Sequence, residues 1–472
     1  MATKKELVEA YQFSRRRLVT AFLSGAPGGR EVEPTKPARS LVGGIALAVL
    51  LCAGAGVAGY LGGRPDSSWK SEGSFVISKD TGEQYVVLRG GDDPLIQRVP
   101  NFISGQLLLG TAQPDVYTVK DEHIRTVTLG PDLGIERAPA GLPGADGLVD
   151  TGWTACTAEG QGIKVHVGEQ PGVATDGLPG FVVRSAGGAL WLLAGSPEGA
   201  AYRFELPGGA TARSTLLDSL GFGAASEAPL VDDAWLNLFP LGPELSQKAF
   251  GVTRAGQPVD YAVASQDGST DPASYPIGTL LDVSGVHYLL GDSGPERLAP
   301  FPAALHAALV QDPVQVSGTL RAEFVAAGHP DEWPQELPAP AVGQEMCALL
   351  EVEEGVSRTR VAVAPGPDAS VLQADAPAGS HEVVVEPSGG AYVLAGGSTS
   401  EEGGSPFVVD AKGAKYALLG PTVADYIGYG EVDPPVVPDA WLSFFADGVP
   451  LSVNAARGLP EDAPADAPAA TS

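Results

Sequence analysis

The stretch LVGGIALAVLLCAGAGVAGYL, from Leu41 to Leu61, separates a short amino-terminal part of the chain from a long carboxyl-terminal part. It holds 21 residues without a charged side chain, and a helix of that length, at about 1.5 Å per residue, crosses the ~30 Å hydrocarbon core of a bilayer. In lipid, a single segment satisfies its own backbone hydrogen bonds only as a helix. The sequence therefore predicts one transmembrane helix over residues 41–62. Two pairs within it have the spacing that lets transmembrane helices pack closely: Gly44 with Ala48, and Ala55 with Gly59.

The charge on either side of this stretch predicts its orientation. Residues 1–40 carry eight Lys and Arg side chains and four Glu side chains, a net charge of +4. Because the whole chain carries −28, the part after the stretch carries −32. Basic residues beside a transmembrane helix stay in the cytoplasm, so the amino terminus is predicted inside and residues after 62 outside. The residues that set this orientation are Arg15, Arg16, Arg17, Lys36 and Arg39.

A cleaved signal peptide is the alternative to an anchor. The leader and the apolar run are both longer than such peptides have, and no A-x-A site follows at the usual place. Residues 3–24 have apolar side chains at helical spacing, and Thr3 with Glu6 has the spacing of a capping box. Such an amphipathic helix could lie on anionic lipid or dock on a partner's cytosolic domain. The alternative is that residues 3–24 only supply positive charge that sets the membrane orientation. That alternative explains the arginines but not the apolar stripe.

The composition of the remaining 400 or so residues indicates two or more domains with hydrophobic cores. The chain has 62 Gly and 41 Pro against 29 Lys and Arg, which predicts many short elements joined by turns. The strong negative charge argues against binding to nucleic acid, because phosphate contacts need a basic face. Outside the cell, an acidic surface favours solubility.

A pattern of an apolar run, a glycine and an aromatic residue three positions later occurs four times. Each copy predicts a β-hairpin in which the glycine takes the positive φ of a tight turn. A hairpin leaves one face unburied, so repeats that stack against shared elements are expected. A fifth, partial copy at Gly389 to Tyr392 is interpreted as coincidence or a decayed repeat. The four glycine–aromatic pairs are Gly82 and Tyr85, Gly188 and Trp191, Gly285 and Tyr288, and Gly413 and Tyr416.

Two of the repeats continue with a second shared element. Residues 229–246 and 435–452 are identical at ten of 18 positions, and both contain the sequence DAWL, with Trp235 and Trp441. DAWL is predicted to begin a helix. The segments FISGQLLLG (102–110) and PAALHAALV (302–310) are the candidate counterparts of this helix in the other two repeats.

The three cysteines divide between the membrane and the exterior. Cys52 lies in the apolar stretch, whereas Cys156 and Cys347 lie in parts predicted to be exported, where disulfides persist. Their segments, 153–168 and 345–353, alternate apolar and polar residues as half-buried strands do. A bridge between them would join two distant strand pairs into a central sheet. Two buried free thiols are the alternative, because sequence does not measure whether the two meet.

These patterns predict an α+β protein with a single amino-terminal transmembrane helix, followed by four hairpin-and-helix repeats around a central β-domain. The predicted segments are a cytoplasmic helix and linker (1–40), the transmembrane helix (41–62), repeat 1 (63–115), the first part of the central domain (116–175), repeat 2 (176–262), repeat 3 (263–315), the second part of the central domain (316–398), repeat 4 (399–457) and a disordered tail (458–472).

No catalytic, cofactor or metal motif is visible in the sequence. The dipeptide Gly-Lys occurs nowhere, which excludes a P-loop, and neither H-E-x-x-H nor G-x-S-x-G occurs. The six histidines are scattered, and His329 with Asp331 and Glu332 is interpreted as a surface turn. We therefore expect no catalytic residue, no cofactor and no metal ligand.

Several of these stretches resemble EccB proteins, membrane components of the type VII (ESX) secretion systems of actinobacteria. The resemblance rests on TKKELVEAYQFSRRRLVTAFLS, the apolar stretch, SFVISKDTGEQYVVL, NFISGQLLLG, Trp153 with Cys156, and VPDAWLSFFADGVPLS, and it covers nearly the whole chain. It implies a single anchor and an elongated, pseudo-twofold extracytoplasmic body with four repeat domains, a central β-domain and a disulfide between distant segments. It also implies self-association and assembly with EccC, EccD and EccE into a plasma-membrane secretion complex.

The expected function is therefore a structural core subunit that helps to assemble the channel. Members of the family are often labelled ATPases, but the sequence contains no site for that label, and an external domain would meet little ATP. The other class of function is a cell-wall enzyme or binding module held at the membrane by its amino terminus. Such a protein would need a cleft with convergent polar groups, which no motif here indicates.

Overall fold

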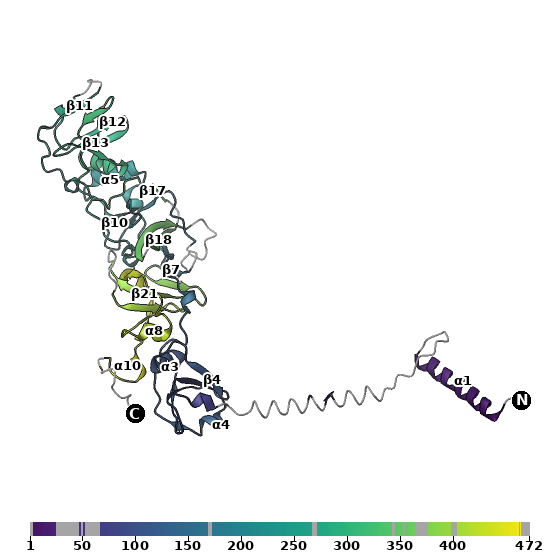
Figure 1. The fold of residues 1–472 in the computed structure, drawn as a ribbon. Helices are drawn as coiled ribbons and strands as arrows, with labels where there is room; N and C mark the ends of the chain where they lie inside the picture. Colours follow the sequence, from purple (N-terminus) through teal and green to yellow (C-terminus); the bar gives the residue numbers. More distant parts are fainter. Residues whose placement is uncertain are drawn as a thin grey trace. The chain divides into compact units, whose positions relative to one another are not determined.

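The computed structural model describes residues 3–24, 47–48, 51, 67–168, 172–266, 271–341, 345–353, 355–364, 376–397, 404–461 and 463 (Figure 1). The chain divides into two compact units, residues 1–66 and 67–472. The predicted membrane segment falls outside the described residues except for 47–48 and 51, and so do Gly44, Ala55, Gly59, Lys36 and Arg39. Ala48 is helical and exposed. Among the helices of the described residues, none is both long and apolar enough to cross a membrane.

The first unit contains helix α1 (Lys4–Ser24). The backbone N–H of Thr3 donates to the Glu6 carboxylate at 2.9 Å, which closes one half of a capping box. Arg15, Arg16 and Arg17 are exposed on this helix. The large apolar side chains that the structure describes on this helix, from Leu7 to Phe22, are also exposed within the unit, and Phe22 reaches 91%.

The second unit is α+β and contains several sheets, as the sequence predicts. Four of its sheets share one connectivity: three antiparallel strands, a helix, a segment that returns parallel to the first strand, and a segment that runs parallel to the third. We call these sheets repeats 1 to 4, by their order along the chain. The same connectivity in all four indicates one supersecondary unit used four times.

Repeat 1 comprises β1 (Ser74–Ser78), β2 (Gln84–Arg89), β3 (Leu95–Val99), α3 (Phe102–Leu109), β4 (Asp115–Val119), α4 (Asp121–Ile124) and β5 (Thr128–Leu129), after the short helix η1 (Ser67–Lys70). Repeat 2 comprises β8 (Pro179–Arg184), β9 (Leu190–Gly195), β10 (Ala201–Glu205), α5 (Ala210–Leu220), η3 (Ala225–Glu227), α6 (Asp233–Leu236) and η4 (Gln247–Phe250), with β17 (Ala339–Pro340) added to its sheet.

Repeat 3 comprises β12 (Leu280–Val283), β13 (Val286–Leu290), β14 (Pro295–Leu298), α7 (Pro300–Leu309) and β15 (Val314–Val316), with a two-stranded sheet of β11 (Val263–Ser265) and β16 (Leu320–Ala322) and the turn η5 (Pro272–Ser274). Repeat 4 comprises β21 (Ala391–Gly396), β22 (Pro406–Val409), β23 (Ala414–Ala417), α8 (Val423–Ile427), β24 (Val436–Pro438), α9 (Asp439–Leu442), β25 (Ala446–Asp447) and α10 (Val453–Ala456).

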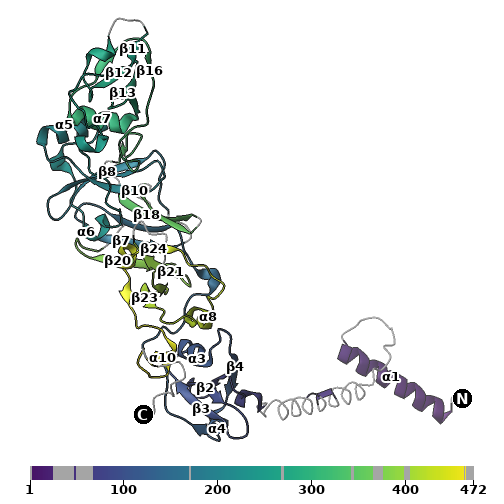
Figure 2. The same cartoon turned by 60° about the vertical axis from the view of Figure 1, so that its left-hand side comes forward.

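The repeats associate in pairs through their helices. Helix α5 of repeat 2 packs on α7 of repeat 3, and α3 of repeat 1 packs on α8 and α10 of repeat 4; Figure 2 shows α5 beside α7 and α3 beside α10. Leu216, Leu217 and Leu220 of α5 share one apolar core with Phe301 and Leu305 of α7. Burial of these side chains is the main stabilising contribution at such a contact.

The fourth repeat starts earlier than the sequence predicts. Strand β21, which contains Tyr392, pairs antiparallel with β22, so the predicted boundary between 398 and 399 cuts through one sheet. The fifth copy of the pattern, at Gly389 to Tyr392, therefore leads into the first strand of repeat 4, which begins at Ala391, and is not a decayed repeat. In the other repeats the glycine lies between the first and second strands, but Gly413 lies between the second and third. The pattern marks a hairpin turn, which any two adjacent strands can use.

Two further predictions about the repeats need correction. Helices α3 and α7 follow the third strand, as α5 and α8 do, so they are counterparts of α5 and α8 and not of the DAWL helices α6 and α9. The DAWL counterpart in repeat 1 is α4, which follows β4. The predicted boundaries at 115 and 315 fall inside β4 and β15, because returning strands of three to five residues carry too little pattern to be recognised.

Candidate functional site: the disulfide-linked central sheet

A five-stranded sheet between repeats 2 and 4 joins two distant parts of the chain. Its strands are β6 (Trp153–Thr157), β7 (Ile163–Val167), β18 (Met346–Glu353), β19 (Val356–Val363) and β20 (His381–Val385), in the order β19-β18-β6-β7-β20. Strands β6 and β18 pair antiparallel with Cys156 directly opposite Cys347. The sheet thus closes only when residues almost two hundred positions apart meet.

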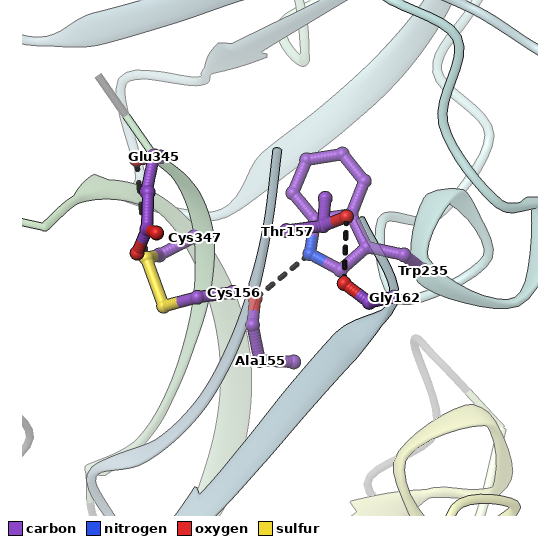
Figure 3. The surroundings of a disulfide bond; sticks show 7 residues. All are labelled: Ala155, Cys156, Thr157, Gly162, Trp235, Glu345 and Cys347. Carbon is purple, nitrogen blue, oxygen red and sulfur yellow. Dashed lines mark hydrogen bonds between the residues drawn. A yellow bond between two sulfur atoms is a disulfide. The ribbon is translucent and has the colours of Figure 1, made fainter. Parts of the chain in front are cut away.

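Cys156 and Cys347 form a disulfide, with their Cα atoms 4.1 Å apart (Figure 3). The bridge predicted from the sequence is confirmed, and it spans 191 positions. Both cysteines are almost fully buried, at 1% and 0% exposure. The Thr157 hydroxyl nearby donates to the Gly162 carbonyl at 3.1 Å, which fixes the β6–β7 turn beside the bridge.

The two faces of the central sheet have different partners, because side chains alternate along each strand. One face, with Trp153, Ala155 and Leu350, belongs to a core shared with repeats 2 and 4. The opposite face carries the disulfide within a smaller apolar cluster. The sheet therefore connects the two repeats through one face and is cross-linked on the other.

Trp235 and Trp441 attach repeats 2 and 4 to this sheet. The Trp235 indole N–H donates to the Ala155 carbonyl at 2.8 Å (Figure 3), and the Trp441 indole N–H donates to the Thr359 hydroxyl at 3.1 Å. Both indoles are 0% exposed. In repeat 2 the DAWL helix is capped by Asp232, whose carboxylate accepts from the Ala234 N–H at 2.8 Å. A short helix thus presents each tryptophan to the sheet, and in repeat 4 that helix, α9, has no side-chain cap.

The outer edge of the sheet carries charged side chains that form ion pairs with one another. Arg360 contacts Glu351 at 2.8 Å, and Arg358 contacts Glu353 at 3.2 Å. With Glu198 these four side chains line a shallow hollow of about 210 Å³. Because each arginine already has a carboxylate partner, the hollow offers little free charge to a ligand.

The sheet holds one buried histidine, His166 on β7. Burial lowers the pKa of His166, and nearby Glu386 partly offsets this, so the imidazole is neutral at physiological pH. Within the parts of the chain that the structure describes, no three His, Cys, Asp or Glu side chains gather as metal ligands. What this arrangement can do is mechanical: it holds two pairs of repeats together.

The predicted turn residues lie at hairpin turns of the four repeats. Gly82, Gly188, Gly285 and Gly413 have φ values of 76°, 85°, 87° and 75°, a region that favours glycine. Their aromatic partners lie apart from one another, one in each repeat. Tyr85 donates to Glu83 at 2.6 Å, Trp191 lies 5.5 Å from the Arg203 guanidinium, Tyr288 contacts Phe324 at 5.3 Å, and Tyr416 donates to Asp410 at 3.2 Å.

Comparison with known proteins identifies the class of protein that has this architecture. The family model described as "Type VII secretion system ESX-1, transport TM domain B" matches residues 1–464. The chain belongs to this family, EccB, as the sequence predicts. Two Mycobacterium tuberculosis proteins named "ESX-1 secretion system ATPase EccB1" are 31% identical over 155 residues. That match covers 33% of this chain and spans less than a third, 30%, of those relatives.

Solved structures with this fold come from ESX assemblies. A chain of the intact ESX-5 inner membrane complex aligns with a TM-score of 0.59 at 22% identity, covering 100% of this chain and 98% of that one. A chain of the EccB3 dimer from the ESX-3 core complex aligns with a TM-score of 0.58 at 21% identity, covering 81% and 99%. At these identities the likeness shows the fold.

Proposed function

We propose that this protein is a structural core subunit of a type VII secretion complex in the plasma membrane. The observation that carries the proposal is the family match over residues 1–464, together with a body built from a cross-linked sheet and paired repeats. In this role residues 41–62 anchor the chain as a single transmembrane helix, with the amino terminus in the cytoplasm. The body from residue 67 onward is extracytoplasmic and helps to assemble the channel.

The disulfide supports the extracytoplasmic placement of the body. Disulfides persist in oxidising compartments and are rare in the cytosol. Cys156 and Cys347 both belong to the second unit, which carries most of the negative charge of the chain. The orientation that places Arg15, Arg16 and Arg17 in the cytoplasm places the disulfide outside.

The partners we propose are subunits that resemble EccC, EccD and EccE, together with further copies of this chain. Three parts of the chain supply contacts in this proposal: the exposed apolar side chains of α1, the small residues of the membrane helix (Gly44, Ala48, Ala55, Gly59) and the repeats. Modest contacts on one chain reinforce each other through effective concentration. The name of a solved relative, an EccB3 dimer, is in keeping with self-association.

A mild-detergent pull-down with mass spectrometry tests this function. The full chain should co-purify with a multi-helix membrane protein and a cytosolic motor ATPase. Deletion of residues 3–24, with Lys36 and Arg39 retained, should preserve membrane insertion but reduce co-purification and secretion. Normal secretion in cells that lack the whole protein would refute the proposed function.

A further inference from the structure

Helix α1 carries a stripe of large apolar side chains that are exposed within the first unit. We call Leu7, Tyr11, Leu18 and Phe22 the apolar stripe, because steps of four, seven and four positions place them on one face of an α-helix. All four are exposed, from 64% for Leu18 to 91% for Phe22. Contiguous apolar surface of this kind is typical of a face that binds a protein or a membrane.

The charged side chains of α1 are sorted around the apolar stripe. Lys4 and Arg15 lie on the same side of the helix as the stripe, one three positions before its first residue and the other four positions after its second. The two carboxylates of the helix, Glu6 and Glu9, lie on the opposite side, about half a turn away. The half of the helix that contains the stripe therefore carries positive charge only.

The chain itself keeps this face close to a lipid surface. Helix α1 ends at Ser24 and the apolar stretch begins at Leu41, so only the 16 residues from 25 to 40 separate them. Even a fully extended segment of that length reaches no more than about 55 Å. A helix on so short a connection meets the membrane at high effective concentration. This step rests on the membrane anchor of the proposed function.

We propose that α1 lies flat on the cytoplasmic surface of the membrane and binds anionic phospholipid. The apolar stripe enters the boundary between headgroups and acyl chains, as in other interfacial amphipathic helices, and Lys4 and Arg15 meet the anionic headgroups. Glu6 and Glu9 face away from the lipid, so no carboxylate is pressed against a negative surface. Phe13 lies on the same side as the two carboxylates, and its exposed ring remains available to other subunits.

The full chain in lipid nanodiscs, without any other secretion subunit, tests this inference. In a Cys52→Ala background, Ser14→Cys places a label within the stripe and Glu9→Cys places one on the opposite side. Each is labelled with the fluorophore NBD, and nitroxide-labelled lipid is the quencher. With equal parts phosphatidylcholine and phosphatidylglycerol, the label at position 14 should lose about half of its fluorescence, and the label at position 9, about 10 Å farther from the lipid, should lose little.

Two substitutions separate the apolar contribution from the charge. Phe22→Gln should remove most of the quenching at position 14. Arg15→Gln should reduce it in the phosphatidylglycerol mixture to the level of phosphatidylcholine alone. Phe13→Gln is the matched control, because it replaces an equally large, exposed side chain on the opposite side and should leave the quenching unchanged. All of these positions are exposed, so the substitutions disturb no core.

Equal quenching at positions 14 and 9 overturns the proposal, and so does quenching that Phe22→Gln leaves unchanged. Quenching that appears at position 14 only after another secretion subunit is added would assign the stripe to a protein partner and also overturn it. Each of these results leaves the co-purification expected of a core subunit untouched, because that measurement does not depend on which face of α1 meets lipid.

Discussion

Trp235 and Trp441 occupy the same position in two copies of the sequence DAWL, and both donate their indole N–H to the central sheet. Their acceptors differ: Trp235 uses the Ala155 carbonyl on β6, and Trp441 uses the Thr359 hydroxyl on β19. One motif thus attaches two repeats to one sheet at two different places. The attachment depends on buried hydrogen bonds, which can be removed one at a time.

Trp235→Phe and Trp441→Phe should each lower the free energy of unfolding by about 1–3 kcal/mol, because a buried hydrogen bond is lost. Urea denaturation followed by circular dichroism measures the change. Trp191→Phe is the control, since the Trp191 indole N–H has no hydrogen-bond partner within the described residues. Equal losses in all three variants would show that ring volume, and not the hydrogen bond, matters.

Replacement of Cys156 and Cys347 by serine should destabilise the protein by up to about 5 kcal/mol. The bridge closes a loop of 191 positions, and in the chain-entropy model longer loops restrict the unfolded state more. Thermal unfolding measures the loss. Cys52→Ala is the control and should leave stability unchanged. Non-reducing peptide mapping should recover one linked pair, and recovery of both thiols in alkylated form would contradict the bridge.

Stability should fall as pH decreases from about 6.5 to about 4, through His306 on α7. Burial among the residues of the repeat 2–repeat 3 contact lowers its pKa to about 4. Because the unfolded chain binds the proton at higher pH than the folded chain, protonation in this window favours unfolding by about 3 kcal/mol.

His306→Leu tests this pH dependence, because leucine binds no proton and is close to histidine in volume. The variant should lose most of the pH dependence in urea denaturation between pH 6.5 and pH 4. His123→Gln, which replaces a half-buried histidine of repeat 1, is the control for replacement of a histidine elsewhere in the chain. If the free energy of unfolding of His306→Leu depends on pH as that of the wild type does, another group causes the pH dependence.

The purified full chain should hydrolyse ATP no faster than background. The sequence lacks Gly-Lys and therefore a P-loop lysine to hold the phosphates. Phosphate release, measured after extensive purification, checks this expectation. Hydrolysis that persists and is abolished by a single substitution would reveal a site of another kind.

Single cysteines at positions 20 and 270, in a chain without Cys52, should differ in reactivity toward an impermeant maleimide. Position 270 should react in intact cells, and position 20 should react only after lysis. The physical reason is the retention of basic flanking residues in the cytoplasm. The reverse pattern would overturn the proposed orientation.

Much of this fold follows from local chemistry and could be predicted. Hairpin turns need a residue that tolerates positive φ, so Gly82, Gly188 and Gly285 marked them in the sequence. The strand segments around Cys156 and Cys347 were predicted from their alternation of apolar and polar residues, although β6 and β7 are buried on both faces and not half-buried. A compartment that permits disulfides suggested their bridge. The DAWL helices were visible because the chain repeats them.

Other features depend on tertiary packing, and no residue pattern indicated them. The membership of β21 in repeat 4 depends on which strand edge it meets, and the partner of helix α5 is helix α7 of another repeat. The hydrogen-bond acceptors of Trp235 and Trp441 could not be predicted from the sequence either. A backbone carbonyl carries no sequence signal, and Thr359 looks like any strand threonine.

The sequence by itself therefore determined the apolar stretch, the charge asymmetry, the hairpin turns and the family, since each depends on residue type and spacing within a short window. The tertiary structure alone decided how the repeats pair. Leu216 and Leu220 of repeat 2, for example, meet Phe301 of repeat 3 in one apolar core. No window of the sequence contains both sides of that contact, because packing joins residues by distance in space and not along the chain.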